Sequence, residues 1–245
     1  MLNILIPMAG KSVFFEHSNY MFPKSLSEVR GQPMIQCVIE DLNTIDEDIN
    51  YIFAINKEDC KKFHLDNVLK LLTDDKAEII RVDGETSGAA CTALLAIESI
   101  NNDDPLIISN SDQKFDCRLD SFIKDFVQRD LDAGVICFNS VHPRWSYALT
   151  DESGRVVEAS EKRPISKQAI AGFFYFKHGK DFVRAAMESI VKDASIGGNY
   201  YIAPVLNEMI LSNKNIGIGS VENKNYHTFY SPQLLEEYNR GQHCD

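Results

Sequence analysis

Short apolar runs alternate with segments of helical periodicity along the chain. The strand-like runs cover residues 4–6, 50–55, 78–82, 106–109 and 133–139, and the helical periods cover residues 59–72, 87–97 and 119–129. A polar turn at 151–154 predicts a hairpin between residues 148–150 and 156–159, followed by a strand at 171–176 and helices at 181–192 and 202–212. This alternation favours a layered α/β domain with a largely parallel sheet.

Composition agrees with one soluble domain, because a chain of 245 residues with 44% hydrophobic content can bury a full core. We find no linker, internal repeat or low-complexity segment. The first residues lack a basic region before a long apolar run, and no segment reaches the roughly 18 apolar residues that span a bilayer. We therefore expect neither export signal nor membrane anchor, and a cytoplasmic location.

Charge and cysteines exclude several classes of function. With 25 basic against 36 acidic residues the formal charge is −11, which opposes binding to nucleic acids and anionic membranes. The six cysteines are scattered without a C-x-x-C pair, so disulfides and a zinc site are not expected. A phosphorylated ligand of this acidic chain requires a local pocket of positive charge.

The N-terminal segment has the order of elements found in phosphate-handling sites. Residues 4–6 form an apolar run, and Met8, Ala9 and Gly10 follow with small side chains that let backbone N–H groups approach an anion. The Pro23-Lys24 pair then returns a positive charge toward the same place. Taken alone, a strand followed by Ala-Gly is weak evidence for a nucleotide site.

Longer motifs carry a resemblance to a known family. PMAG at 7–10, followed by FPK-x-L-x-x-V-x-G-x-PMI from residue 22, resembles the N-terminal signature of nucleoside-diphosphate-sugar pyrophosphorylases. Further matches follow in family order: DGETSGAACTALLA from 83, PLIISNSDQ from 105, HPRWSYA from 142, EKRPIS from 161, AGFFYFKHGKDF from 171 and NYYIAPVLNEMI from 199. Together they cover nearly the whole chain.

The resemblance implies a fold and a reaction. It implies a single Rossmann-like domain of the glycosyltransferase-A type with a mostly parallel mixed central sheet, spanning residues 1–245. Residues 1–115 would bind the nucleotide and residues 116–245 the acceptor. The implied enzyme is a Mg²⁺-dependent nucleotidyltransferase that joins a nucleoside triphosphate to a sugar phosphate or other small phosphate monoester and releases pyrophosphate. We expect the product to be a precursor of a surface polysaccharide.

Three residues are the candidate catalytic set, each by its match to a family motif. Asp112 follows the strand at 106–109 and corresponds to the family's metal-binding aspartate. Lys24 corresponds to a contact with the triphosphate, and Lys162 to the lysine that holds the acceptor phosphate, with Glu161 as a hydroxyl acceptor. The plainer interpretations are an Asx turn at Asp112, a solvated loop lysine at Lys24 and a surface charge pair at Glu161-Lys162.

Other matches supply candidate binding residues. The nucleotide-binding set is Met8, Ala9, Gly10, Lys11, Lys24, Gly84, Thr86, Gly88 and Ala89; the acceptor-binding set is Trp145, Tyr147, Glu161, Lys162, Gly172, Asn199 and Tyr200. Alternatives stay open for several of them: Thr86 and Asn199 suit helix caps, and Trp145 suits a core position. His227 is open as a second metal ligand, a phosphate contact or neither. Aromatic residues near Phe173 and Phe174, expected to be exposed, are candidates for a subunit contact, so a homo-oligomer is left open.

The chain also departs from the family pattern near the expected triphosphate. The family continues its first turn as G-x-G-x-R-F, whereas Ser12 replaces the second glycine here and Phe14 stands where the arginine would be. Losing one preorganised donor typically costs on the order of 10² to 10³ in rate. Lys11 offers a cation in the same loop, without the planar fork of arginine. The family commonly has an acidic residue before the Tyr-Tyr pair, and Asn199 stands at that position here. No aspartate stands near residues 230–235 as a second metal ligand.

Two other classes of function stay open from the sequence. The first is a non-catalytic protein that binds a nucleotide or sugar phosphate on the same scaffold, which the missing arginine favours and the retained Lys24, Asp112 and Lys162 oppose. The second is a glycosyltransferase, a class that often holds its metal through a pair of aspartates. NSDQ at 110–113 supplies one such carboxylate only.

Overall fold

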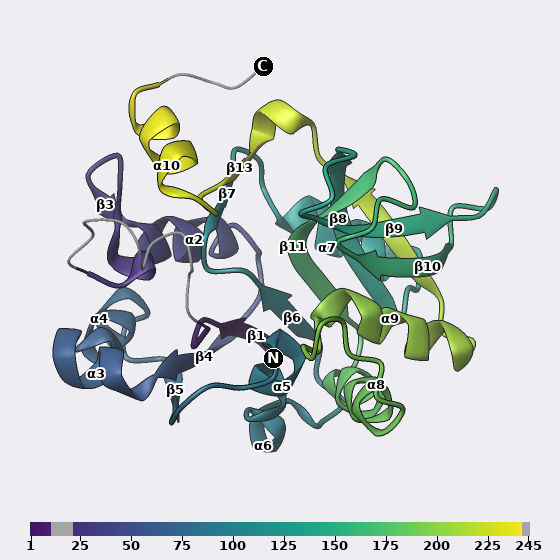
Figure 1. Cartoon of the computed structure of the whole chain (residues 1–245), viewed down its shortest axis with the longest axis horizontal. Helices are drawn as coiled ribbons and strands as arrows, with labels where there is room; N and C mark the ends of the chain where they lie inside the picture. Colours follow the sequence, from purple (N-terminus) through teal and green to yellow (C-terminus); the bar gives the residue numbers. More distant parts are fainter. Residues whose placement is uncertain (11–21, 242–245) are drawn as a thin grey trace.

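Parallel strands form the centre of the structure, a computed structural model that describes residues 1–10 and 22–241. β1 (Leu2–Pro7) pairs in parallel with β4 (Ile49–Asn56) on one side and with β6 (Leu106–Ser109) on the other. β5 (Ala77–Val82) extends this group beyond β4. The four strands run in one direction, so their carboxyl ends lie at the same edge of the sheet (Figure 1).

The second half of the chain adds mostly antiparallel strands. β11 (Gln168–Phe176) runs antiparallel to β6 and to β8 (Ala133–Asn139), and β12 (Ile216–Ser220) runs parallel to β8. The hairpin of β9 (Ser146–Thr150) and β10 (Val156–Glu161) joins through β9. The central sheet of the described residues thus has nine strands in a mixed arrangement. The predicted α/β class with a mixed central sheet is confirmed.

Helices cover both faces of the sheet because successive side chains of each strand point to opposite faces. Ile4 and Ile6 of β1 join one apolar core, and Leu5 between them joins the other. The first core includes side chains of α2 (Met34–Leu42), α3 (Lys57–Phe63), α4 (Leu65–Leu72) and α7 (Asp120–Gln128). The second includes those of α5 (Ala89–Leu94), α6 (Ile97–Ile100), α8 (Gly179–Val191) and α9 (Ile202–Leu211).

Two helices predicted as continuous are each broken in two. The period at 59–72 becomes α3 and α4, because His64 adopts a left-handed conformation with φ of 54° that ends the first helix. The period at 87–97 becomes α5 and α6, and the first of them begins two residues later than predicted. Among the helices of the described chain, none combines the length and the apolar character needed to cross a membrane.

Several short elements were not predicted, because segments of two or three residues show no periodicity. They are the 3₁₀ turns η1 (Lys24–Leu26) and η2 (Asn223–Asn225), and the strands β2 (Glu28–Val29), β3 (Gln32–Pro33), β7 (Gln113–Phe115) and β13 (Tyr226–Thr228). A last helix, α10 (Pro232–Asn239), was also missed. It buries Leu235 and Tyr238 against Val29 and Met34, so the end of the chain packs onto the segment that follows Lys24.

The expectation that Phe173 and Phe174 are exposed was wrong. Phe173 has no exposed surface and Phe174 is 6% exposed. Both lie on β11, which has β6 on one side and β8 on the other, so their rings face the two helical layers. These two side chains therefore belong to the cores and offer no subunit contact.

The cysteines behave as small apolar residues. Cys37, Cys60 and Cys137 are buried, and each cysteine of the described part of the chain is a free thiol.

Replacing Phe173 by alanine tests its place in the core. We expect Phe173→Ala to lower the free energy of unfolding by about 3–5 kcal/mol, because it removes a buried ring and leaves a cavity. Urea denaturation followed by circular dichroism measures the change. Val191→Ala is the control, because Val191 is 86% exposed on α8 and its loss should change stability by about 0.5 kcal/mol or less. Equal effects of the two substitutions would contradict the burial of Phe173.

Candidate active site

The carboxyl edge of the parallel strands gathers the turns that carry the candidate nucleotide residues. Ala9, just after β1, packs against Ala54 at the end of β4 and Val82 at the end of β5. The Met8 amide donates to the Ala54 carbonyl at 2.8 Å, which fixes the backbone that leads to Gly10. Small side chains at this edge leave the backbone accessible, as an anion-binding turn requires.

Lys24 and Asp112 meet at this edge although 88 residues separate them in the sequence. The Lys24 ammonium donates to Asp112 Oδ2 in a short ion pair, and the two side chains are 17% and 21% exposed. Lys24 opens η1 directly after Pro23, whose φ of −59° directs the chain into the turn. The structure therefore brings together two of the three candidate catalytic residues.

The turn that carries Asp112 is anchored by three hydrogen bonds, to Phe229 and Gly172. The Phe229 amide, directly after β13, donates to the Asp112 carbonyl at 2.7 Å, and the Asn110 amide donates to the Gly172 carbonyl at 2.9 Å. The Gln113 side-chain amide donates to the same Gly172 carbonyl at 3.2 Å. Gly172 has a φ of +58°, and a Cβ there would lie 2.2 Å from Asn110 Nδ2. Gly172 thus leaves room for the turn.

A close backbone contact joins the candidate nucleotide turn to the candidate acceptor segment. The Tyr200 amide donates to the Ser87 carbonyl at 2.8 Å, and the Ala90 amide donates to the Tyr200 carbonyl at 3.0 Å. Gly88 permits this approach, since a Cβ at this position would lie 2.4 Å from the Tyr200 carbonyl oxygen. The two sets of residues are therefore parts of one continuous edge.

Thr86 does not cap α5, which was the alternative role considered for it. Gly88 is the N-cap residue of the helix, which begins at Ala89, and no side chain caps it. The Thr86 hydroxyl lies 2.5 Å from the Thr92 hydroxyl, one turn into the helix. Gly84, earlier in this turn, has a φ of +81° and open space where a Cβ would be.

Glu161 is the last residue of β10 and Lys162 follows it, and their side chains have specific partners. The Ser146 hydroxyl donates to Glu161, and burial raises the pKa of this carboxyl despite that hydrogen bond. The Lys162 amide donates to the Trp145 carbonyl at 3.0 Å, and its ammonium donates to the Tyr201 hydroxyl at 2.7 Å. This hydrogen bond to Tyr201 raises the pKa of Lys162, which keeps the side chain cationic.

The remaining acceptor candidates differ in how far they can reach a ligand. Tyr147 is fully buried, and its hydroxyl donates to the His142 carbonyl at 2.6 Å. Trp145 is half-buried, with its ring edge-on to Phe138 at 5.2 Å between centroids. Asn199 does not cap α9, whose N-cap residue is Tyr201. The side-chain Nδ2 of Asn199 donates instead to the Gly197 carbonyl at 3.3 Å. Trp145 and Asn199 keep surface for a ligand, whereas Tyr147 supports the loop from within.

His227 contacts Asp116 and Tyr238. It stands opposite Lys114 in the pairing of β13 with β7, with its Nε2 2.8 Å from Asp116 and its ring 4.9 Å from that of Tyr238. No group of three or more histidine, cysteine, aspartate or glutamate side chains is placed to hold a metal within residues 1–10 and 22–241. Asp112 is the carboxylate that pairs with Lys24 at the carboxyl edge.

Some residues at this edge were not found from the sequence. Gln113 and Tyr201 each stand next to a candidate, but their contacts with Gly172 and Lys162 join distant segments. Lys11, Ser12 and Phe14, the residues of the loop that departs from the family pattern, lie outside the described residues.

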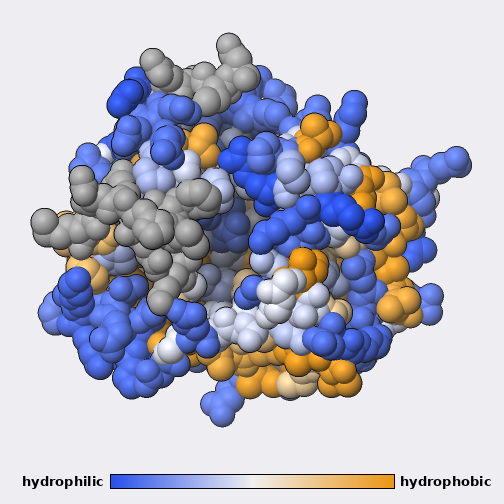
Figure 2. Space-filling view, in the orientation of Figure 1, coloured by the Kyte–Doolittle hydropathy of each residue, from blue (hydrophilic) through white to orange (hydrophobic). Residues whose placement is uncertain are grey.

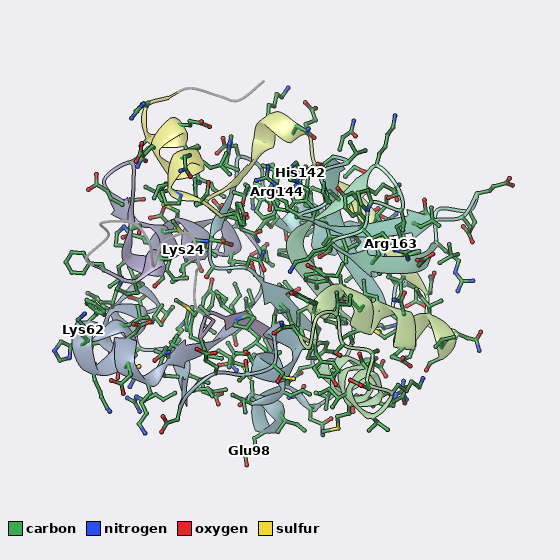
Figure 3. All side chains as sticks on the ribbon, viewed as in Figure 1. Lys24, Lys62, Glu98, His142, Arg144 and Arg163 are labelled. Carbon is green, nitrogen blue, oxygen red and sulfur yellow. The ribbon has the colours of Figure 1, made fainter. Side chains whose placement is uncertain are left out.

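Figure 2 shows a hollow near the middle of the face of the molecule that is in view, and Figure 3, in the same orientation, labels Lys24 at one side of it.

Comparisons with known proteins agree with this arrangement. A family model described as nucleotidyl transferase matches residues 18–209. The nucleoside-diphosphate-sugar pyrophosphorylase of Vibrio cholerae RC9 has a similar structure, with a TM-score of 0.85, 22% identity, and coverage of 97% of this chain and 99% of the other. A Bacillus anthracis protein assigned as a glucose-1-phosphate thymidylyltransferase, in complex with sucrose, gives a TM-score of 0.73 at 18% identity, covering 99% and 95% of the two chains. Among curated proteins, none matches the sequence.

Gly88→Ala tests the joint between the two segments. The new Cβ would press on the Tyr200 backbone in a residue whose φ is +104°, so we expect a loss of about 2–5 kcal/mol in stability. Gly84→Ala is the matched control, because it carries similar backbone strain with no atom within 4 Å and should cost about 1–2 kcal/mol. Urea denaturation of the two variants gives the comparison, and a smaller loss for Gly88→Ala would contradict the close approach.

Glu161→Gln tests the raised pKa of Glu161, for which burial is the main cause. Below the ordinary glutamate pKa of about 4.3, the carboxyl is protonated in both folded and unfolded chains and has no effect on stability. As pH rises through the raised pKa of the folded state, the buried charge lowers stability. We expect Glu161→Gln to remove this part of the decline, measured by thermal denaturation at a series of pH values. Glu152→Gln, at an exposed turn residue, should leave the decline in place; parallel wild-type and Glu161→Gln curves would refute the assignment.

Proposed function

The chain belongs to the nucleotidyl transferase family, and from this premise we propose that it joins a nucleoside triphosphate to a sugar phosphate or other small phosphate monoester. The observation that carries the proposal is the Lys24–Asp112 pair at the carboxyl edge of the sheet. Open α/β sheets bind their ligands at this edge. The names of the two similar structures, a pyrophosphorylase and a thymidylyltransferase, support a sugar phosphate as the acceptor.

The reaction defines what the residues have to do. An oxygen of the acceptor phosphate attacks the α-phosphorus of the triphosphate, and the bond from that phosphorus to the bridging oxygen breaks as pyrophosphate leaves. Both reactants are anions, so the protein must neutralise charge and align the attacking and leaving oxygens. No general base is needed, because the attacking phosphate oxygen is already ionised near neutral pH.

The roles follow from the positions of the cations. Lys24 would neutralise charge on the triphosphate, which the backbone from Met8 to Gly10 and the turn from Gly84 to Ala89 would hold. Lys162 would hold the acceptor phosphate, and the half-buried Glu161 would accept a hydroxyl of the acceptor. Residues 1–115 would thus form the nucleotide half and residues 116–245 the acceptor half.

The residues at the edge fit a Mg²⁺ ion of the kind that phosphate substrates bring with them. Mg²⁺ is usually held by one or two carboxylates together with substrate phosphates, and not by a complete protein cage. Asp112 offers one partly exposed carboxylate beside Lys24, which suits this mode. A bound Mg²⁺ would supply charge neutralisation to the phosphate oxygens.

The place of the reaction in the cell is part of the same proposal. Joining a nucleotide to a sugar phosphate activates the sugar for later transfer. The product would therefore be a precursor of a surface polysaccharide, made by this protein in the cytoplasm.

Pyrophosphate release tests this function. The purified protein is incubated with Mg²⁺, each nucleoside triphosphate and a panel of small phosphate monoesters. We expect release with one triphosphate and one acceptor, and a fall of about 10² to 10³ in kcat for Lys24→Met and Asp112→Asn. Removing Mg²⁺ with EDTA should also stop release.

A second ion pair of the same kind provides the control. Lys177 and Asp130 form an exposed lysine–aspartate pair, and Lys177→Met and Asp130→Asn should keep activity within about twofold. Saturable nucleotide binding that depends on Lys24, without any pyrophosphate release, would instead indicate the non-catalytic binding protein.

A further inference from the structure

Arg144 stands next to the proposed acceptor site, on the loop between β8 and β9. The carbonyl of the following residue, Trp145, accepts the hydrogen bond from the Lys162 amide at 3.0 Å. The pairing of β9 with β10 sets Ser146 opposite Glu161. Arg144 therefore lies two residues before the start of β9, next to the end of β10 where Glu161 and Lys162 stand. Its position is therefore fixed relative to Lys162 by backbone hydrogen bonds.

The guanidinium of Arg144 is held by rings and an imidazole. Its central carbon lies 5.4 Å from the centroid of the Trp145 ring and 5.3 Å from that of Tyr230, within the range of cation–π contact. Its Nε donates to His142 Nδ1 at 3.2 Å. These contacts orient the side chain while Arg144 itself remains exposed.

Arg144 forms no ion pair with a carboxylate of residues 1–10 or 22–241. Several other arginines do form such pairs: Arg81, Arg129, Arg163, Arg184 and Arg240. Arg30, Arg118 and Arg155 also lack such a pair among the described residues, so what distinguishes Arg144 is its position: a guanidinium held by His142 and two rings next to the strand ends that carry Glu161 and Lys162. Its planar fork suits two parallel hydrogen bonds to a carboxylate or phosphate.

Tyr230 connects Arg144 to the rest of the edge. It follows Phe229, whose amide donates to the Asp112 carbonyl. The pKa of Lys162 is raised mainly by the hydrogen bond to Tyr201, and the electrostatic interaction with Tyr230 raises it further. The ring of Tyr230 thus has the guanidinium of Arg144 against it and Lys162 within electrostatic reach. Figure 3 labels Arg144 and Lys24 on opposite sides of the hollow in Figure 2.

We propose that Arg144 binds a second anionic group of the acceptor, a carboxylate or a further phosphate, in addition to the phosphate at Lys162. This inference rests on the proposed transferase function and narrows its acceptor to the class of acidic phosphate monoesters. Two separate cations beside one acceptor match two separate negative charges. The loop of Arg144 leads directly into β9, whose pairing with β10 ends at Glu161 beside Lys162, so the structure favours the acceptor over the triphosphate as its ligand.

Matched acceptors that differ in one group test the proposal. The pairs are glucose 1-phosphate with glucuronic acid 1-phosphate, and glycerol 3-phosphate with 3-phosphoglycerate, in which a CH₂OH group becomes a carboxylate. Glucose 1,6-bisphosphate distinguishes a second phosphate from a carboxylate. Binding to the full chain is measured by calorimetry with Mg²⁺ and the α,β-methylene analogue of each triphosphate, and KM and kcat are measured by pyrophosphate release.

We expect an acidic acceptor to bind at least about 10-fold more tightly than its neutral partner, as hydrogen bonds between charged groups allow. Arg144→Gln should abolish this preference, and Arg144→Lys should restore part of it. Arg163→Gln is the matched control, since Arg163 is an exposed arginine near the same hairpin that pairs with Glu158 at 2.5 Å. It should leave the preference unchanged.

Other results would overturn the proposal. If Arg144→Gln weakened the binding of neutral and acidic acceptors equally, Arg144 would be assigned to the phosphate that both share. If it weakened only the binding of the triphosphate analogue, Arg144 would be assigned to the nucleotide. Failure of the wild-type protein to bind any acidic member would also refute it. Tight, Arg144-dependent binding without pyrophosphate release would refute the transferase function and leave this inference standing.

Discussion

The parallel pairing of β1 with both β4 and β6 is the constraint on which the rest of the structure depends. A strand with parallel neighbours on both sides is buried on both faces, and Ile4, Leu5 and Ile6 have no exposed surface. Their alternation anchors one helical layer on each face. The same pairing aligns the carboxyl ends of the strands, so the turns after β1, β5 and β6 meet at one edge.

Backbone hydrogen bonds then join the segments that carry the candidate site residues. Tyr200 bonds to the turn before α5, Trp145 to Lys162, and Phe229 to Asp112. The first and third of these bonds join segments of the second half of the chain to turns of the first half, and the second closes the end of the β9–β10 hairpin. Gly88 makes the approach of Tyr200 possible, and Gly172 makes room for Asn110 in the turn before Asp112, because a Cβ at either position would meet that neighbour at 2.4 Å or less.

Charge is distributed to match this geometry. The chain is acidic, yet Lys24, Lys162 and Arg144 all lie around the same edge. Each is oriented by a specific contact: Lys24 by Asp112, Lys162 by Tyr201, and Arg144 by His142 and two rings. Local cations in an acidic protein concentrate attraction for an anionic ligand where it is needed.

The sequence by itself determined the α/β class, the central strands and the neighbourhood of Asp112, because alternating periods and strand-end turns are local signals. It could not show that Phe173 is buried, that His64 breaks a helix, or that β13 and α10 exist. Those features depend on which strands become neighbours and on contacts such as Tyr238 against Val29. Tertiary structure alone decided that Lys24 meets Asp112, that Tyr147 is core, and that Arg144 lies beside Tyr230, since these partners are joined by packing across the fold and not by spacing along the chain.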